Sequence, residues 1–404
     1  MSTSLLYRAF GVRGYHFSGM LYEPGRVVIR IVHGPRTLCC SQCGSHDVIR
    51  RGQWPRVFRT VPIGSRRVVL ALPVQRVECR RCGAVAQVKL GFANERRTYT
   101  RAFERYAVEL SKRMTIQDVA EHLGVSWDVI KDIQKRYLTR RFGKPKLRRL
   151  AIMAVDEISI GHGHKYLTVV LNLETGAVVF VGDGKGVSAL KPFWTLVKRA
   201  RARIRAVAMD MSPAYISAVQ ANLPKAVIVF DHFHVIKLYN EKLSDLRRDL
   251  QREATDLLEK KVLKGTRWLL LKNPENLDDQ HNERQRLEEA LRVNKPLATA
   301  YYLKEDLRRF WEQPDKATAA AFLQDWIARA EVSGVRMLKD FAKTLAAHRS
   351  GLLAYYAFPI STGPLEGTNT KIKVLQRQAY GFRDVAFFKL KILGLHETKY
   401  ALVG

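Results

Sequence analysis

The spacing of apolar residues changes several times along the chain, and each change predicts a different kind of element. Two β-rich runs, VFRTVPIG at 57–64 and RRVVLALPVQRVE at 66–78, are separated by turn residues and predict a hairpin. Between residues 115 and 137 the apolar positions recur at helical spacing, interrupted by LGVS. This segment predicts a helix-turn-helix, with Ser126 as the N-cap of its second helix.

Apolar β-rich runs return after residue 150. LAIMAVDEISI, HKYLTVVLNLE and AVVFVGDG follow one another with short connections, and IRAVAMDMS and AVIVFDHFHV each follow a helical stretch. Three successive strands, followed by alternating helices and strands, predict a mixed α/β sheet. From residue 238 to about 357 apolar residues at helical spacing alternate with charged faces, which predicts an all-helical bundle.

The composition is that of a soluble globular protein. The chain has 404 residues, enough for two to four domains, and 47% of them are hydrophobic. No apolar run approaches the ~18 to 20 residues that cross a bilayer, and the first 30 residues lack a signal-peptide pattern. These features favour a cytoplasmic protein without a membrane partner.

The charge is strongly unbalanced. The 69 Lys and Arg against 38 Asp and Glu give a formal net charge of +31, which repels itself unless a polyanion is the usual partner. Residues 1–150 hold 30 basic and 10 acidic side chains, so the N-terminal third carries most of the excess. This distribution predicts that the N-terminal third docks on nucleic acid; the alternative is a basic but inert surface.

Four of the five cysteines form two Cys-x-x-Cys pairs, Cys40 with Cys43 and Cys79 with Cys82, each followed by Gly. Two such turns can complete a tetrahedral zinc site, and four protein ligands leave no open position for chemistry. We therefore predict a zinc ribbon that holds a small basic module rigid. A redox role for either pair is the alternative, and Cys39 could substitute for Cys40.

The second helix of the helix-turn-helix is predicted to offer its exposed side to a DNA groove, although any short helical hairpin gives a similar pattern. The basic linker RRFGKPKLRR at 140–149 follows it, marks a domain boundary and strengthens the DNA interpretation. The predicted DNA contacts of this region are Trp127, Lys131, Lys135, Arg140, Arg141, Lys144 and Lys146.

Three carboxylates stand out in the second half of the chain. Asp156 interrupts an apolar strand, and Asp210 ends another. Charges at buried strand positions are costly unless paired or metal-bound, so ion pairs with Arg or Lys are one explanation and Mg²⁺ is the other. Glu366 is the only acid between Phe341 and Arg383. It could cap a helix whose first residue is Pro364, or complete a two-Mg²⁺ site for phosphodiester chemistry.

The phrases AVDEIS, HKYLTVVLNLETG, AMDMSPAY, VIVFDHFHVIKLYN and STGPLEGTNTKIKVLQRQAYGF, with the upstream cysteine pairs, resemble the ISL3 family of bacterial insertion-sequence transposases over nearly the whole chain. The resemblance implies an RNase H-like catalytic domain with a DDE triad matched by Asp156, Asp210 and Glu366. Family members usually have Asp where this chain has Asn172, which we expect to lie outside the metal site.

Further residues follow from the resemblance. Asp231 and His234 look like the Asp-x-x-His pair of related transposases. His234 would contact the scissile phosphate or orient the surroundings of Asp210; the alternative is a solvent-facing turn. Trp268 looks like an element of such insertions that stacks on a nucleotide, against the alternative of core packing. Lys373 and Arg377 lie seven and eleven residues after Glu366. This spacing puts both on the helix face of Glu366, where they would sit near phosphates, and Lys371 of the same helix is a further predicted DNA contact.

The expected organisation is α/β with an interrupted RNase H-like domain. It comprises a zinc ribbon at 1–92, a helix-turn-helix and linker at 93–149, catalytic parts at 150–237 and 358–404, and the helical insertion at 238–357. The expected activity is Mg²⁺- or Mn²⁺-dependent cleavage of double-stranded DNA at terminal inverted repeats and strand transfer to a target, by a homodimer or larger assembly associated with the nucleoid. The alternatives are an RNase H-like structure-selective nuclease and a non-catalytic DNA-binding regulator.

Overall fold

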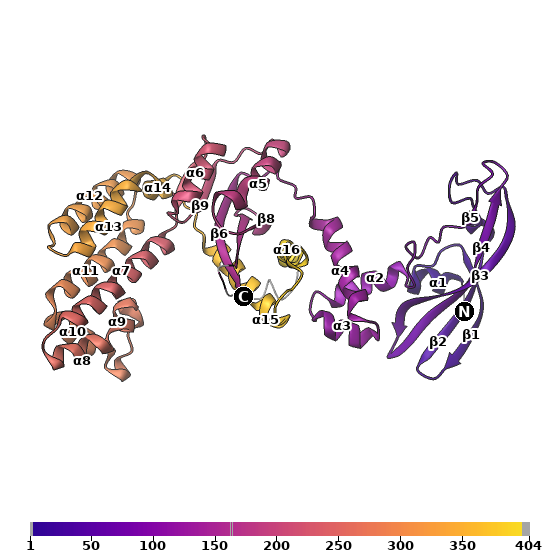
Figure 1. Ribbon diagram of the computed structural model, residues 1–404, viewed down its shortest axis with the longest axis horizontal. Coiled ribbons are helices and arrows are strands. Elements are labelled where there is room, and N and C mark those ends of the chain that lie inside the picture. Colours follow the sequence, from indigo (N-terminus) through magenta and orange to yellow (C-terminus); the bar gives the residue numbers. More distant parts are fainter. Residues whose placement is uncertain (1–2, 162, 164, 398–404) are drawn as a thin grey trace. The chain divides into compact units, whose positions relative to one another are not determined.

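The computed structural model describes residues 3–161, 163 and 165–397. The chain forms two compact units. The N-terminal unit contains the residues up to 144 together with 382–390, and the second unit contains residues 145–381 and 391–396. Figure 1 shows the order of the elements in each unit. In the described ranges no helix is both long and apolar enough to cross a membrane. The predicted domain boundaries themselves stay predictions.

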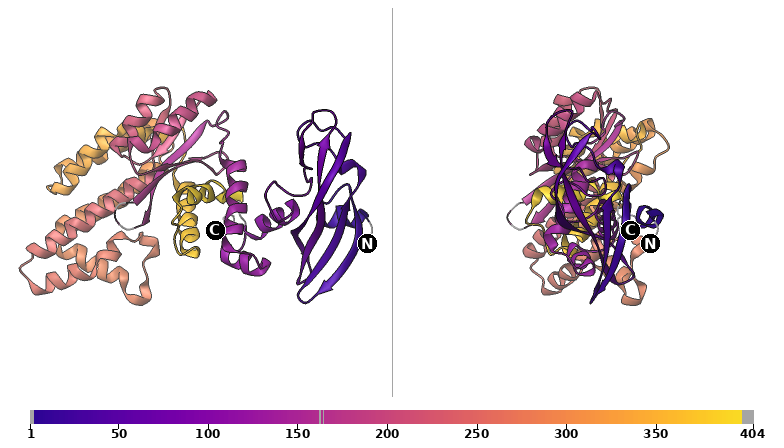
Figure 2. Two further views of the ribbon diagram at one scale, coloured as in Figure 1. Left: turned by 45° about the vertical axis from the view of Figure 1, so that its right-hand side comes forward. Right: turned by 90° about the vertical axis from the view of Figure 1, so that its right-hand side faces the viewer.

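The N-terminal unit begins with a five-stranded sheet. β1 (Tyr15–Glu23), β2 (Arg26–His33), β4 (Arg66–Cys79) and β3 (Val48–Ile63) lie in that order, and β5 (Val85–Gln87) pairs with β4. The predicted hairpin is β3 with β4, which Figure 2 shows as the long antiparallel strands of this sheet. Alternating residues such as Leu70 and Leu72 form its core, which α1 (Thr3–Phe10) covers with Leu6 and Phe10.

Three helices follow this sheet: α2 (Arg101–Leu110), α3 (Ile116–Leu123) and α4 (Trp127–Phe142). α3 ends at Gly124, whose φ of 59° lies in the left-handed region that Gly favours, and a Cβ there would lie 2.3 Å from the Arg67 guanidinium. Ser126 is the N-cap residue of α4, as predicted, although its side chain makes no capping hydrogen bond. The predicted pair of short helices joined by a Gly turn is therefore confirmed.

The second unit contains a mixed sheet in the order β10-β9-β6-β7-β8. β6 (Ile152–Gly161), β7 (Lys165–Asn172) and β8 (Ala177–Asp183) are antiparallel neighbours. β9 (Ala206–Met209) and β10 (Val227–Phe230) run parallel to β6, connected through α5 (Val187–Ala200) and α6 (Pro213–Asn222). The predicted mixed α/β sheet is confirmed.

A long helix, α7 (His232–Glu253), leads from the end of β10 into the predicted helical bundle, as Figures 1 and 2 show. The bundle comprises α8 (Leu257–Gly265), α9 (Arg267–Leu271), α10 (Glu283–Val293), α11 (Lys295–Arg308), α12 (Lys316–Val332), α13 (Arg336–Ala347) and α14 (Arg349–Leu353). Buried residues of the sheet and the bundle belong to one continuous core, from Met153 through Tyr239 to Trp326. The bundle is therefore packed onto the sheet rather than tethered to it.

The chain returns to the sheet as α15 (Gly363–Gln378), followed by α16 (Val385–Leu393). Side chains alternate across β6, so Val155 packs in the core with Leu190 and Phe193 of α5, whereas Asp156 points the other way. Asn369 of α15 donates a hydrogen bond to Asp156, and Figure 1 shows α5 and α15 on opposite sides of the sheet. This returning helix completes the candidate site.

Candidate active site and cysteine cluster

Strand register places Asp156 on β6 next to Asp210, which directly follows the last residue of the adjacent strand β9. Ala154 of β6 pairs with Ala208 of the parallel strand β9. Asp156 and Asp210 lie two residues beyond that pair, so both point to the same face at neighbouring positions. The backbone N–H of Glu157 donates to Asp156 Oδ1 at 2.7 Å, and that of Ser212 donates to Asp210 Oδ1 at 3.0 Å.

The electrostatics of Asp156 are those of a crowded acidic site. Burial raises its pKa, and the negative charges of Asp210 and Glu157 raise it further, while the Glu157 backbone N–H and His234 lower it. Neither Asp156 nor Asp210 is paired with Arg or Lys in the described part of the chain, so the ion-pair alternative is not supported. A cation between them would relieve the repulsion.

Glu366 lies on the first turn of α15 but does not cap it. The helix begins at Gly363, so Pro364 is its second residue rather than its first, and Glu366 is the fourth. Among the described residues the Glu366 carboxylate has no hydrogen-bond or ion-pair partner, which removes the support for a capping role. Burial raises the pKa of Glu366, with further contributions from the charges of Asp231 and Asp156 against the opposing effect of His234.

Asp231 is buried and links the N-terminal ends of α7 and α15. Its side chain is 1% exposed, which contradicts the alternative of a solvent-facing turn for this residue. Asp231 is the N-cap residue of α7, and its Oδ1 and Oδ2 accept hydrogen bonds from the backbone N–H (3.1 Å) and the hydroxyl (2.9 Å) of Thr362, the N-cap residue of α15. Both carboxylate oxygens are therefore used in holding the start of the Glu366 helix.

Two polar atoms near the carboxylates lack partners. Nε2 of His234 and Oδ1 of Asn369 are shielded from solvent and make no hydrogen bond within the described chain. Asn369 donates its Nδ2 to Asp156 Oδ2 at 2.8 Å. Sequence reasoning missed Asn369, although its position three residues after Glu366 puts both on one helix face. Unpaired buried polar atoms are costly, so a substrate or ion that pairs them would be favoured here.

The carboxylates are close enough to influence one another, but they are not gathered around one point. Over the described ranges, the only group of three or more His, Cys, Asp or Glu whose ligand atoms lie within 4.8 Å of one another is the cysteine cluster. Carboxylates shared between two ions about 3.5–4 Å apart need not meet that limit. The hard oxygen donors fit Mg²⁺ in type.

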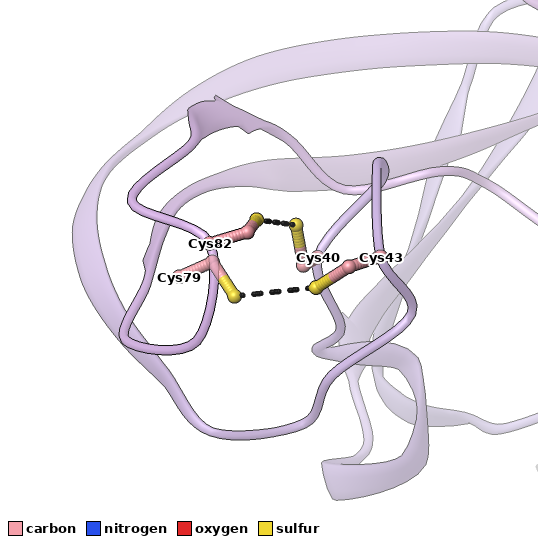
Figure 3. Close-up of side chains that lie close together, drawn as sticks. All are labelled: Cys40, Cys43, Cys79 and Cys82. Atoms are coloured by element: carbon pink, nitrogen blue, oxygen red, sulfur yellow. Dashed lines mark hydrogen bonds between the residues drawn. The ribbon is translucent and has the colours of Figure 1, made fainter.

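The four predicted cysteines come together in the N-terminal unit, as Figure 3 shows. Cys40 Sγ lies 3.6 Å from Cys82 Sγ, and Cys43 Sγ lies 3.5 Å from Cys79 Sγ. Cys39 is outside this group, so the cluster contains Cys40 of the two alternatives. All four sulfur atoms are within the reach of one tetrahedral ion, which is the arrangement predicted for zinc.

The protonation of these thiols also fits a cation. The backbone N–H groups of Cys43 and Gln42 lower the pKa of Cys40 to about 6. The backbone N–H of Ala84 lowers that of Cys82, but the neighbouring Cys43 and Cys40 side chains outweigh it and raise the pKa of Cys82 to about 12. The raised pKa of Cys82 means that this thiol keeps its proton without a cation, whereas zinc would hold it as a thiolate.

Two of the predicted DNA-contacting residues of α4 form ion pairs within the protein. Trp127 is 42% exposed, as expected of a contact residue. Lys131 and Lys135, however, both bind Asp384, at 3.3 and 3.0 Å, within the N-terminal unit. The backbone N–H of Phe387 and the two lysines lower the pKa of Asp384 to about 2. These lysines are therefore paired with a carboxylate rather than open to a groove.

The remaining predicted DNA contacts are at the surface. Trp268 is 66% exposed with the Arg267 guanidinium 4.7 Å from its ring centroid, which contradicts the alternative of core packing. Lys371 is half-buried. Exposed positions are occupied by Arg140, Arg141, Lys144, Lys146, Lys373 and Arg377.

Comparison with known proteins assigns the chain to a family. A family model described as "Transposase" matches residues 153–392, more than half of the chain. A second model, "Helix-turn-helix domain of transposase family ISL3", matches residues 88–138, which include α3 and most of α4. The sheet, α15 and the candidate carboxylates all fall within the first match.

Relatives of similar length carry the same description. The chain is 34% identical to the transposase for insertion sequence element IS1001 of Bordetella parapertussis, over 92% of both chains. It is 28% identical to the transposase for IS1557 of Mycobacterium tuberculosis (strain CDC 1551 / Oshkosh), over 95% of this chain and 91% of that one. A Drosophila P element transposase strand transfer complex is a distant structural match, with a TM-score of 0.33, 12% identity and coverage of 64% of this chain and 77% of that one. By the family models and the IS1001 relative, the chain belongs to the ISL3 family of transposases.

Proposed function

We propose that this insertion-sequence transposase cuts and joins DNA by a DDE mechanism in an RNase H-like domain, with Asp156, Asp210 and Glu366 holding two Mg²⁺ ions. The observation that supports the proposal is that Asp210 and Glu366 are both close enough to Asp156 for their charges to interact with it, while none of the three carboxylates forms an ion pair with Lys or Arg among the described residues. When bound, the two ions supply an activated attacking oxygen and stabilise the leaving oxygen. Water would first cut a phosphodiester and free a 3′-OH, which would then attack a target phosphodiester.

Other residues would orient this centre. Asn369 would hold Asp156 through its amide hydrogen bond, and the unpaired Nε2 of His234 would donate to an oxygen of the scissile phosphate. Asp231 would act through Thr362 as a positioning residue rather than touch the substrate. Lys371, Lys373 and Arg377 on α15 would contact phosphates near Glu366. Trp268, with its exposed ring, would stack on a base.

The N-terminal unit would select the DNA. The cysteine cluster would hold one structural zinc ion that keeps the β3–β4 hairpin and its flanking turns in place. α4 and the basic linker would bind the terminal inverted repeats. A homodimer or larger assembly is proposed because both ends of an element must be brought together.

Product analysis of the wild-type protein separates this proposal from its rivals. The substrate is a labelled duplex that carries the element's own terminal repeat, incubated with unlabelled target DNA and either Mg²⁺ or EDTA. We expect Mg²⁺-dependent cuts that leave 3′-OH ends, followed by joined products. Cuts without joined products would identify a nuclease, and binding without any cut at all Mg²⁺ or Mn²⁺ concentrations would identify a regulator.

A separate prediction concerns the buried contact between Asp231 and Thr362. In Asp231→Asn, an NH₂ group replaces one of the two acceptor oxygens, and the negative charge that strengthens both hydrogen bonds to Thr362 is lost, so the start of α15 loosens. We expect roughly 10- to 100-fold slower cleavage, with a higher Mg²⁺ concentration needed for half-maximal rate, because Glu366 lies one turn away. The measurement is the cleavage rate as a function of Mg²⁺ concentration.

The matched control is Asp249→Asn, on the exposed part of the same helix α7. It should leave both the rate and the Mg²⁺ dependence unchanged. If Asp231→Asn lowers thermal stability but keeps the wild-type Mg²⁺ dependence, Asp231 is a structural residue and its positioning role is wrong.

A further inference from the structure

The second unit has a concentration of arginines outside the candidate active site. Arg148 and Arg149 precede β6, while Arg199, Arg201 and Arg203 come from the end of α5 and the loop before β9, and all five line one hollow of about 610 Å³. We propose that this arginine hollow is a docking site for the phosphate backbone of duplex DNA on the catalytic unit. Arg148 and Arg149 are the last residues of the predicted basic linker, whereas Arg199, Arg201 and Arg203 were not among the predicted DNA contacts.

The fold holds both segments of the arginine hollow in place. Leu147 and Leu150 flank the first arginine pair, are 1% and 2% exposed, and belong to the main core of the second unit. In the other segment, Val197 and Ile204 are anchored in the same core. Apolar anchors on both sides of each arginine group therefore fix where the charges emerge.

The turn at the end of α5, which joins Arg199 to Arg203, is also fixed. Arg201 ends α5 with a φ of 52°, in the left-handed region that costs free energy for a side chain other than Gly. The backbone N–H of Arg201 donates to Lys198 O at 3.1 Å, and that of Ala202 donates to Val197 O at 3.2 Å. This closed turn directs neighbouring guanidinium groups to one side of the helix end.

No carboxylate among the described residues neutralises the five guanidinium groups. All five residues are exposed, and in the part of the chain that the structure describes none of them makes an ion pair or a side-chain hydrogen bond. Glu174, in the turn after β7, is exposed at this sheet edge but does not line the hollow. Five unneutralised charges repel one another, so a polyanion would be stabilised here.

The lining of the arginine hollow selects phosphate rather than base. Besides the five arginines, only Leu150, Ala151 and Ala200 line it, so it offers no aromatic ring for stacking and no side-chain acceptor for a base. Unpaired bases need such rings, whereas duplex backbone needs only positive charge at suitable spacing. Guanidinium groups also bind phosphate oxygens in a bidentate manner. The structure therefore favours sequence-independent binding of a duplex.

The hollow lies at the edge of the sheet where β6 and β9 begin. Asp210 follows the opposite end of β9, whose four residues span about 13 Å. Duplex bound at the hollow would thus engage a surface separate from the carboxylates. The inference rests on the proposed function only for DNA as the class of ligand. Its test measures DNA binding and does not require catalysis.

The test measures binding of the full-length protein to a duplex of unrelated sequence in EDTA, over a range of salt concentrations. The variant combines Arg199→Gln, Arg201→Gln and Arg203→Gln. If each arginine neutralises one phosphate, the slope of log Kobs against log salt becomes shallower by about 2 to 3. The control combines Lys316→Gln, Lys339→Gln and Lys343→Gln, three exposed cations of the bundle, and removes the same charge.

We expect the control to change the slope by less than about 0.5. An unchanged slope in the arginine variant, or an equal change in the control, would overturn the proposal. The unfolding temperature of the arginine variant should equal or exceed that of the wild type, because like charges have been removed; a fall would show that the arginines support the fold instead. Failure of the wild type to cleave DNA would refute the proposed function. The binding result could still be interpreted, because binding is measured in EDTA, where no cleavage takes place.

Discussion

Glu366→Gln is expected to abolish Mg²⁺-dependent cleavage and strand transfer while leaving binding to the terminal repeat unchanged. Gln keeps the size of the side chain but removes the charge that would hold the ion. The wild-type carboxylate has no protein partner among the described residues, so the substitution breaks no internal contact. We expect a loss of roughly 10³-fold or more in the cleavage rate, corresponding to several kcal/mol of lost metal-dependent stabilisation.

The same variant makes a prediction for stability that distinguishes a metal ligand from a helix cap. Burial raises the pKa of Glu366 in the folded protein, so the ionised form weakens folding at pH values above its ordinary range. Removing the charge should therefore leave the unfolding temperature in EDTA unchanged or raise it. A cap would behave oppositely, because losing it lowers stability.

Glu331→Gln is the matched control, since Glu331 is an exposed glutamate on α12 of the same unit. It should retain wild-type cleavage, joining and stability. If Glu366→Gln still cuts DNA and only its unfolding temperature falls, Glu366 is a structural residue and the triad is misassigned. If neither wild type nor variant cuts while both bind the repeat, the chain acts as a DNA-binding regulator.

The sequence could predict those features that depend on local pattern. Apolar periodicity located the β3–β4 hairpin, α3, α4 and the strands of the mixed sheet, because burial imposes periods of two and 3.6 on strands and helices. The neighbouring positions of Asp156 and Asp210 depend on register between β6 and β9, which local pattern does not encode. Their pairing was therefore inferred from chemistry and resemblance, and the geometry came only with the fold.

Contacts between distant segments could not be predicted. Asp231 looked like a surface turn residue or a catalytic one, because nothing local indicates that Thr362, 131 residues later, would occupy both of its oxygens. Asp384 likewise lies far along the chain from the Lys131 and Lys135 that it neutralises. Core packing was the alternative for Trp268 because Trp side chains are highly buried on average, yet its ring is exposed.

Cys43→Ser is expected to eliminate bound zinc and to destabilise the N-terminal unit. Cys43 is the suitable position because its side chain is exposed, so Ser costs little in packing, whereas Cys40 and Cys79 are buried. A three-ligand site holds zinc far less tightly, and structural zinc contributes its binding free energy directly to folding. Zinc content should fall from about one ion per chain to near zero. Affinity for the terminal repeat should also fall at least about 10-fold, because α3 contacts the sheet that the zinc site stabilises.

Cys39→Ser is the control, because Cys39 adjoins Cys40 in sequence but lies outside the cluster. It should keep one zinc ion and wild-type repeat binding. If Cys39→Ser loses zinc, the ligand set is wrong; if the purified wild type contains no zinc and all four cluster thiols react freely, there is no zinc ribbon. Mg²⁺-dependent cutting by Cys43→Ser on a duplex supplied at saturating concentration would further show that the zinc supports DNA selection rather than the chemical step, since its four protein ligands leave no open coordination position.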